Sequence, residues 1–393
     1  MSSLKYWVWL SRLRGLGGQT RLSLLRRFGT AEDVFYADEA ELQLTEGITR
    51  EQLERLKNHD LEEADRILAD CQRLHIGILT MQDAAYPGRL RSIYDPPCLL
   101  YYRGRLPAFD EEAAVAVVGT RSASPYGVAC AEKLGYGLTS GGAVVVSGLA
   151  RGIDAAASRG ALRAGGITAG VVGNGLDVAY PRSSRDLYED IAAAGVLLSE
   201  YPPGTEPAPS HFPARNRILS GLCVAALVVE APERSGALIT AAAALEQGRD
   251  VFAVPGPIDA PASRGCNRLI REGAGLVADP WDLLGEYVHR FPDKLHAEAV
   301  QPLPPPVATP QPPEKEAVAA PPTVSLSQGG LTDDQIALLR LLDLEAPILA
   351  DDLIEDSGIP TRRVLSALTV LEIDGLVCQH SGKRYTRLVE LRP

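Results

Sequence analysis

The chain of 393 residues has few of the side chains on which catalytic and metal sites depend. Its six histidines and six cysteines are scattered, and no two cysteines have the CxxC spacing of a zinc or redox site. Neither a GxSxG nucleophile elbow nor a paired carboxylate motif occurs. These absences predict a protein that needs no metal and no cofactor, and we expect it not to be an enzyme.

Long apolar runs and targeting features are also lacking. No stretch approaches the length of a membrane span. Arg12 and Arg14 interrupt the apolar patch near the N-terminus before the core of a signal peptide is complete. Isolated cysteines are typical of reduced thiols inside the cell. We therefore expect a cytoplasmic protein without a membrane partner.

Positive charge is scarce overall, since the net charge is −11. This balance argues against a protein that coats DNA along its whole surface, although a local basic groove is compatible with it. Residues 1–29 carry six basic residues and no acidic one, whereas residues 331–390 carry eleven acidic and six basic ones. Any binding of a polyanion is therefore expected to be local.

The length predicts two to four domains. Residues 1–75 show helical spacing, and their glycine turns near Gly15 and Gly47 have the outline of helix-hairpin-helix motifs. Such turns contact either DNA or protein, and the sequence leaves both open. Residues 76–110 form a connector in which prolines fix the turns and Leu99 to Tyr102 predicts a strand that joins the main sheet.

Residues 111–290 alternate apolar strands with alanine-rich helices, which predicts an α/β core with a Rossmann-like, doubly wound parallel sheet. The expected strands are 114–118, 143–146, 168–172, 196–199, 224–229, 250–253 and a possible late one at 276–278. Residues 291–330 are rich in proline and predict a disordered linker. Residues 331–393 predict a winged-helix domain, whose acidity favours a protein contact but leaves a DNA contact open.

Glycines and arginines follow the ends of several expected strands. Arg121 follows the first strand, Arg151 the second, and Arg182 the third. Because the carboxyl ends of parallel strands open on one crevice, we expect these groups to converge on a phosphate. The predicted phosphate-binding residues are Gly119, Thr120, Arg121, Ser147, Gly148, Arg151, Asn174, Arg182, Arg185, Phe212, Arg215 and Arg217.

Several of these residues have a structural alternative. Phe212 is suited to stack on a base while Arg215 or Arg217 meets a phosphate, or it packs beneath its loop while one arginine pairs with a glutamate. The Ser235–Gly236 helix start binds an anion or caps only itself. His211, in a proline-rich loop, is expected to be a structural or binding residue and not a base.

These motifs together resemble the DprA (Smf) family of bacterial DNA-processing proteins. The matching runs are VAVVGTR at 115–121, SGLARGID at 147–154, GNGLDVAYPR at 173–182, SEYPPG at 199–204, FPARNRILSGL at 212–222, VVEAPERSGALITA at 228–241, VPGPID at 254–259 and the segment from Gly265 to Gly273. They cover nearly all of the expected core in the family's order. The flanking helical domain, similar to SAM or helix-hairpin-helix domains, and the winged helix agree with longer members in architecture.

The resemblance implies an extended Rossmann core that binds single-stranded DNA without base specificity, forms a homodimer and loads the RecA recombinase. It implies a role in natural transformation, or competence, and in DNA recombination. Arg121 is the leading DNA residue by this resemblance, and Arg182 stands where many relatives have lysine. The dimer and RecA surfaces cannot be placed from the sequence.

Two other functions remain open at this stage. A nucleotide-binding Rossmann enzyme, similar to phosphoribohydrolases, would act on a nucleoside monophosphate, but the PGGxGTxxE segment expected there has no counterpart around Ser235 or Pro255. A winged-helix transcription regulator fits the C-terminal pattern but not its acidity.

Overall fold

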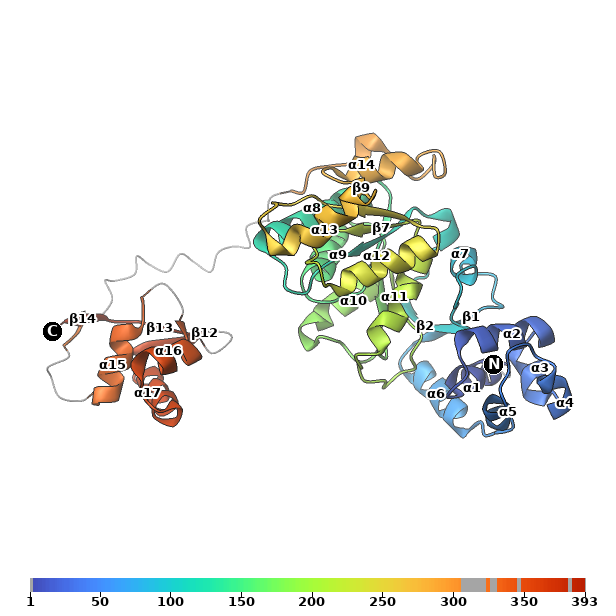
Figure 1. Cartoon of the computed structure of the whole chain (residues 1–393), viewed down its shortest axis with the longest axis horizontal. Coiled ribbons are helices and arrows are strands. Elements are labelled where there is room, and N and C mark those ends of the chain that lie inside the picture. Colours follow the sequence, from blue (N-terminus) through green and yellow to red (C-terminus); the bar gives the residue numbers. More distant parts are fainter. Residues whose placement is uncertain (1–2, 305–322, 326–330, 345–347, 381–383, 393) are drawn as a thin grey trace. The chain divides into compact units, whose positions relative to one another are not determined.

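The structure, a computed structural model, describes residues 3–304, 323–325, 331–344, 348–380 and 384–392. The chain forms two compact units, residues 1–304 and residues 305–393 (Figure 1). None of the described helices is long and apolar enough to cross a membrane.

A nine-stranded sheet forms the centre of the first unit, in the order β1-β2-β6-β5-β4-β3-β7-β8-β9. Strands β3 to β9 pair in parallel, whereas β2 is antiparallel to β6 and β1 is antiparallel to β2. The strands are β1 (Gly77–Thr80), β2 (Leu99–Gly104), β3 (Ala114–Val118), β4 (Val144–Ser147), β5 (Thr168–Val172), β6 (Val196–Ser199), β7 (Ala225–Val228), β8 (Asp250–Ala253) and β9 (Gly275–Leu276). The predicted α/β class with a largely parallel sheet is confirmed, and the connector strand joins the sheet as expected.

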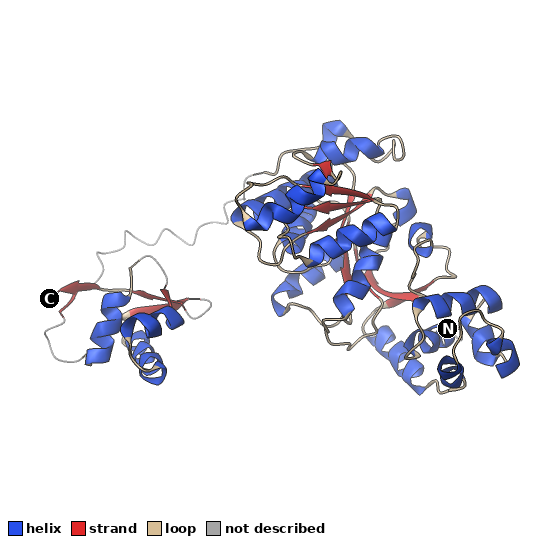
Figure 2. Cartoon of the chain, viewed as in Figure 1, coloured by secondary structure: helices blue, strands red, loops and turns tan. Residues whose placement is uncertain are grey.

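Helices cover both faces of this sheet (Figure 2). Successive side chains of a strand point to opposite faces, and β3 divides in this way: Ala114, Ala116 and Val118 belong to one apolar cluster. Val115 and Val117 belong to another cluster on the opposite face. Because β3 is buried on both faces, its sequence is continuously apolar. The covering helices are α8 (Pro125–Ser140), α9 (Ile153–Arg163), α10 (Arg185–Ala194), α11 (His211–Gly221), α12 (Gly236–Glu246), α13 (Arg264–Arg271) and α14 (Pro280–Leu284).

The chain reverses its direction across the sheet beside β3. From β3 it proceeds outward through β4, β5 and β6, and it then returns to β7 on the other side of β3. Helix α8, which follows β3, packs in one apolar cluster, and helix α12, which follows β7, packs in the other. The boundary between β3 and β7 is therefore the topological switch point, where open α/β sheets bind their ligands.

Glycines let α8 and α9 lie against each other. A Cβ atom added to Gly135 would stand 2.1 Å from the carbonyl oxygen of Ala157, and one added to Gly160 would stand 2.2 Å from that of Glu132. The small residues of these helices therefore serve contact between the two helices, in addition to packing on the sheet.

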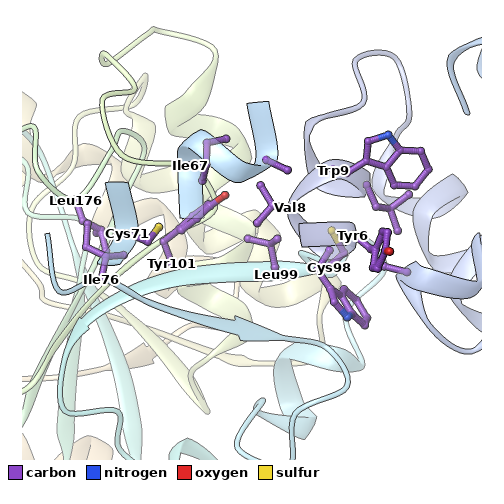
Figure 3. Close-up of a cluster of buried hydrophobic side chains, with 14 of the residues drawn as sticks. Tyr6, Val8, Trp9, Ile67, Cys71, Ile76, Cys98, Leu99, Tyr101 and Leu176 are labelled. Atoms are coloured by element: carbon purple, nitrogen blue, oxygen red, sulfur yellow. The ribbon is translucent and has the colours of Figure 1, made fainter. Parts of the chain in front are cut away.

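Six short helices precede the sheet, and they confirm the helical N-terminal region. They are α1 (Leu4–Arg12), α2 (Gly18–Phe28), α3 (Ala31–Tyr36), α4 (Glu39–Gln43), α5 (Arg50–Leu56) and α6 (Glu62–Arg73). Ile67 and Cys71 of α6 and Val8 of α1 bury their side chains with Leu99 and Tyr101 of β2 (Figure 3). Strand β2 thus couples the N-terminal helices to the sheet.

The predicted linker 291–330 begins too early. Phe291 and Leu295 are buried in the apolar cluster beneath α8 and α14, and Lys294 forms an ion pair with Glu112 at 2.6 Å. The chain therefore stays packed on the core to about Pro304, whose carbonyl accepts a hydrogen bond from Arg163. The burial of Phe291 and Leu295 keeps this stretch packed on the core in spite of its prolines. Residues 305–322 and 326–330 of the predicted linker lie outside the described residues.

The second unit contains the predicted winged helix. Helices α15 (Asp333–Leu341), α16 (Ala350–Ser357) and α17 (Thr361–Ile373) surround one apolar core with strands β11 (Ile348–Leu349), β12 (Val377–His380) and β13 (Arg384–Arg387). Thr332 and Gln335 form a capping box at the start of α15. Strands β10 (Thr323–Ser325) and β14 (Glu390–Arg392) pair in parallel.

Candidate functional site

The turn after β3 requires glycine because other backbone and side chains approach it closely. A Cβ atom on Gly119 would lie 2.4 Å from the Ile153 side chain, and one on Gly152 would lie 2.4 Å from the Thr120 carbonyl oxygen. Gly152 also has φ +80°, which favours glycine. The loops after β3 and β4 are thus pressed together at one edge of the sheet.

A buried acid fixes these two loops. The Gly119 N–H donates to a carboxylate oxygen of Asp154 at 3.3 Å. Burial raises the pKa of Asp154 to about 6, and the positive charge of Arg215 and nearby backbone N–H groups oppose that rise. Burial also lowers the pKa of Arg215, against the opposing effect of the Asp154 carboxylate. Asp154 and Arg215 are therefore two buried ionisable groups beneath the loops, and each influences the pKa of the other through its charge.

An arginine and two aromatic rings lie above this pair. The guanidinium carbon of Arg121 is 4.9 Å from the centroid of the Phe212 ring. The Phe212 ring is 5.6 Å from that of Tyr180, with the two planes tilted by 36°. Phe212 therefore does not pack entirely beneath its loop: it supports an exposed arginine on one side and a half-exposed tyrosine on the other.

Two cavities meet at Arg121 and Phe212. The smaller, of about 70 Å³, lies over the ends of β4 and β5, and the larger, of about 410 Å³, lies between the loops after β3 and β7. The predicted residues that line the smaller cavity are Arg121, Gly148, Arg151, Asn174, Phe212 and Arg215. Those that line the larger one are Gly119, Thr120, Arg121, Phe212 and Arg215.

The other predicted residues lie outside both cavities. Ser147 is fully buried and its hydroxyl donates to the Asp154 carbonyl at 3.4 Å, so it supports the loop. Arg182 and Arg185 are exposed at the start of the segment that follows β5.

Arg217 is engaged in a different network. Its guanidinium group pairs with Asp95 at 3.0 Å and with Glu200 at 2.8 Å, and it also donates to the Ala214 carbonyl. The charge of Glu200, more than that of Asp95, raises the pKa of Arg217 and overcomes its desolvation. The structure thus places Arg217 as the arginine that pairs with a glutamate, away from both cavities. Arg215 is also buried, and it donates to the Val171 carbonyl.

Five polar or charged lining residues of the larger cavity are absent from the set predicted from the sequence: Asp154, Asn216, Arg234, Ser235 and Thr240. The sequence indicated the Ser235–Gly236 helix start as a segment that binds an anion or caps only itself. In the structure, the Ser235 hydroxyl accepts a hydrogen bond from the Ala237 N–H. No local pattern connects this helix start with the β3 turn, because only the sheet order places β7 beside β3.

Metal binding and general-base catalysis have little support in the described part of the chain. No group of three or more His, Cys, Asp and Glu side chains there is arranged to hold a metal ion. His211 stacks on Tyr201, with ring centroids 4.0 Å apart, and its Nδ1 lies 2.9 Å from the Gly173 carbonyl oxygen. His211 therefore positions the start of α11, as the sequence suggested.

Known proteins are similar to this chain over nearly its whole length. Protein Smf from Synechocystis is 35% identical over 404 aligned positions, which cover 98% of this chain and 99% of that protein. DNA processing protein DprA from Streptococcus pneumoniae is 50% identical over 205 residues, covering 52% of this chain and 72% of that protein. The X-ray structure of the pneumococcal protein superimposes with a TM-score of 0.64 and 39% identity over 72% of this chain and 97% of that one.

Two family descriptions match successive parts of the chain. The DprA winged helix domain matches residues 304–383. DNA recombination-mediator protein A matches residues 77–288, which include both cavities and the sheet beneath them. The chain therefore belongs to the DprA (Smf) family of DNA recombination mediators.

Proposed function

We propose that this protein binds single-stranded DNA by its sugar-phosphate backbone, without base specificity, along the carboxyl edge of the central sheet. The binding surface is the cationic rim, defined as the exposed arginines that follow the ends of β3, β4, β5 and β7: Arg121, Arg151, Arg182, Arg185 and Arg234. Their guanidinium groups make no ion pair with any residue in the described ranges.

The observation that carries this proposal is the position of Arg121 beside two aromatic rings. Its guanidinium carbon lies 4.9 Å from the centroid of the Phe212 ring, and that ring lies 5.6 Å from the ring of Tyr180. Arginine next to an aromatic ring offers a phosphate partner and a stacking surface within one nucleotide's reach, and stacking on a ring is tolerant of base identity. A single strand presents both its phosphates and its unpaired bases, whereas a duplex keeps its bases stacked inside.

The overall negative charge does not oppose this surface. Polyanion binding depends on the local arrangement of arginines, and the rim gathers five of them on neighbouring loops. Arg217 and Arg215 act beneath the rim: Arg217 pairs with Asp95 and Glu200, and Arg215 donates to the Val171 carbonyl.

In the cell, this binding serves to load RecA onto single strands taken up in natural transformation, with the protein acting as a homodimer and without a catalytic step of its own. Family membership as a recombination mediator supports this role. Light scattering with and without a dT oligomer measures the dimer, and RecA-dependent ATP hydrolysis on single strands already covered by a competing binding protein measures loading.

The direct test is the anisotropy of a labelled dT oligomer with Arg121→Glu. We expect at least a tenfold loss of affinity, because the substitution replaces an attractive charge by a repulsive one. Arg105→Glu is the matched control, since Arg105 is exposed, unpaired and placed beside Gly195, at the amino edge of the sheet. Equal losses in both variants, or none in Arg121→Glu, would remove the rim as the binding surface.

A further inference from the structure

The larger cavity lies at the switch point of the sheet. The turn after β3 forms one wall and the loop from Pro232 to Ser235, which follows β7, forms the opposite wall. Ligands of doubly wound sheets bind at this position, outside the carboxyl ends of the strands. A volume of about 410 Å³ is within the range of small-molecule sites and is several times that of the neighbouring cavity.

Helix α12 begins in the wall of this cavity. Its eleven residues start at Gly236, and the first turn of a helix leaves N–H groups without intrahelical partners. The Ser235 hydroxyl satisfies only the Ala237 N–H, at 3.3 Å. A Cβ atom added to Gly236 would meet no atom within 4 Å, so the backbone there is open to a ligand. Together with the helix dipole, this end of α12 favours an anion.

Two buried polar groups at the cavity have no partner among the described residues. Thr240, one turn into α12, is only 2% exposed, and its hydroxyl group makes no hydrogen bond there. Arg215 is 5% exposed, and its Nε has no hydrogen-bond acceptor. A polar group that stays without a partner in the folded protein is destabilising. The Nε of Arg215 is fully enclosed, so the Thr240 hydroxyl group is the one to which a ligand in this cavity can supply a partner.

The cavity is positively charged and partly apolar. Arg121, Arg215 and Arg234 line it, against the single carboxyl group of Asp154, which already accepts the Gly119 N–H. Leu219, Ile239 and the Phe212 ring supply apolar surface beside these polar groups. This combination suits a ligand with a strongly anionic end and an uncharged ring.

We propose that the larger cavity binds a nucleoside 5′-phosphate, either the phosphorylated 5′ end of a DNA strand or a free nucleotide. A terminal phosphate carries about −1.5 to −2 charges and three free oxygens. A phosphodiester inside a strand carries one charge and two free oxygens, fewer than the helix start, Thr240, Arg121 and Arg234 can engage. The strand-end form deepens the proposed DNA-binding function and rests on it, whereas the free-nucleotide form does not.

The test compares ligands on the full chain. Anisotropy is measured with two short dT oligomers that differ only in a 5′-phosphate or a 5′-hydroxyl group, and calorimetry is performed with adenosine 5′-monophosphate, adenosine and inorganic phosphate. For a strand end, we expect the phosphorylated oligomer to bind about tenfold more tightly. For a free nucleotide, we expect adenosine 5′-monophosphate to bind while adenosine does not.

Thr240→Val is the diagnostic variant. It removes the hydroxyl group while keeping the shape of the side chain, and this hydroxyl group has no hydrogen-bond partner among the described residues whose loss would impair folding. We expect it to reduce the phosphate-dependent affinity about tenfold, as for a hydrogen bond to a charged group. Thr139→Val is the matched control, because the Thr139 hydroxyl is also buried without a partner but lies in α8, away from both cavities.

The outcomes separate this inference from the proposed function. Equal affinity for both oligomers, together with no binding of adenosine 5′-monophosphate, overturns the inference even when the strand itself binds. Binding of adenosine 5′-monophosphate without binding of either oligomer overturns the proposed function and supports a free-nucleotide site. An unchanged phosphate preference in Thr240→Val overturns the assignment to this cavity.

Discussion

The guanidinium group of Arg121 lies 4.9 Å from the centre of the Phe212 ring, and both residues line both cavities at the carboxyl edge of the sheet. One residue follows strand β3 and the other begins helix α11, so the contact joins segments 91 positions apart in the chain (212 − 121). In the proposed binding of a single strand we expect their roles to differ, because one is a charge and the other a stacking surface.

This difference is measurable in the salt dependence of binding. Arg121→Ala should reduce the slope of log K against log salt by about 0.7, the value for one phosphate contact of a single strand. Phe212→Leu should weaken binding to dT oligomers by about 1 to 3 kcal/mol and leave the slope unchanged, because stacking releases no counterion. Anisotropy titrations at several salt concentrations measure both. A changed slope in Phe212→Leu would contradict the assigned roles.

Arg217 should affect stability and not DNA binding. Replacing it by methionine leaves Asp95 and Glu200 without their shared partner, and we expect a loss of about 2 kcal/mol in the free energy of unfolding. Denaturant unfolding followed by circular dichroism measures this loss, with Arg105→Met as the exposed control. At a temperature where the variant is folded, its affinity for dT should equal that of the unsubstituted protein; a large loss would place Arg217 on the DNA.

Asp154 should make stability depend on pH. Its pKa is raised from 3.8 to about 6, so the folded protein keeps this proton between pH 4 and pH 6 while the unfolded chain releases it. The free energy of unfolding therefore falls as the pH rises through this window and is constant, for this group, above it.

The asparagine variant isolates this contribution from the other carboxyl groups. Between pH 4 and pH 7, the stability of Asp154→Asn relative to the unsubstituted protein should rise on the order of 2 to 3 kcal/mol. Thermal or denaturant unfolding at several pH values measures the difference. Parallel pH profiles for the two proteins would show that the pKa of Asp154 is not raised.

Gly135 offers a test of the contact between α8 and α9. Helix propensity alone predicts that Gly135→Ala stabilises the protein by about 1 kcal/mol. The contact with the Ala157 carbonyl at 2.1 Å predicts the opposite sign, a destabilisation of at least 2 kcal/mol, because backbone must move. Ala129→Gly, at an exposed position of α8, is the control and should cost only its propensity, about 1 kcal/mol.

The sequence was sufficient for the strands and for the glycine turn that follows β3. Val115 to Val118 is continuously apolar because β3 is buried on both faces, and the glycines that follow mark the close approach of two loops. These are local patterns, and each depends on residues within a few positions of one another. Family motifs then placed the function on the same turn.

Residues 291–304 show where local reasoning failed. Their prolines predicted a disordered segment, but Phe291 and Leu295 find an apolar site beneath α8 and α14 that no nearby sequence reveals. The fate of Arg217 was equally open, because its acidic partners lie 122 and 17 positions away.

The sequence by itself determined the α/β class, the helical and winged-helix regions and the identity of Arg121 as the arginine at the strand end. Only the tertiary structure decided that the β3 turn faces the start of α12 and forms the larger cavity with it, while Arg215 and Arg217 support the loops from beneath. The physical reason is that sheet order brings β7 beside β3, and charge pairing and burial depend on neighbours that are distant in the chain.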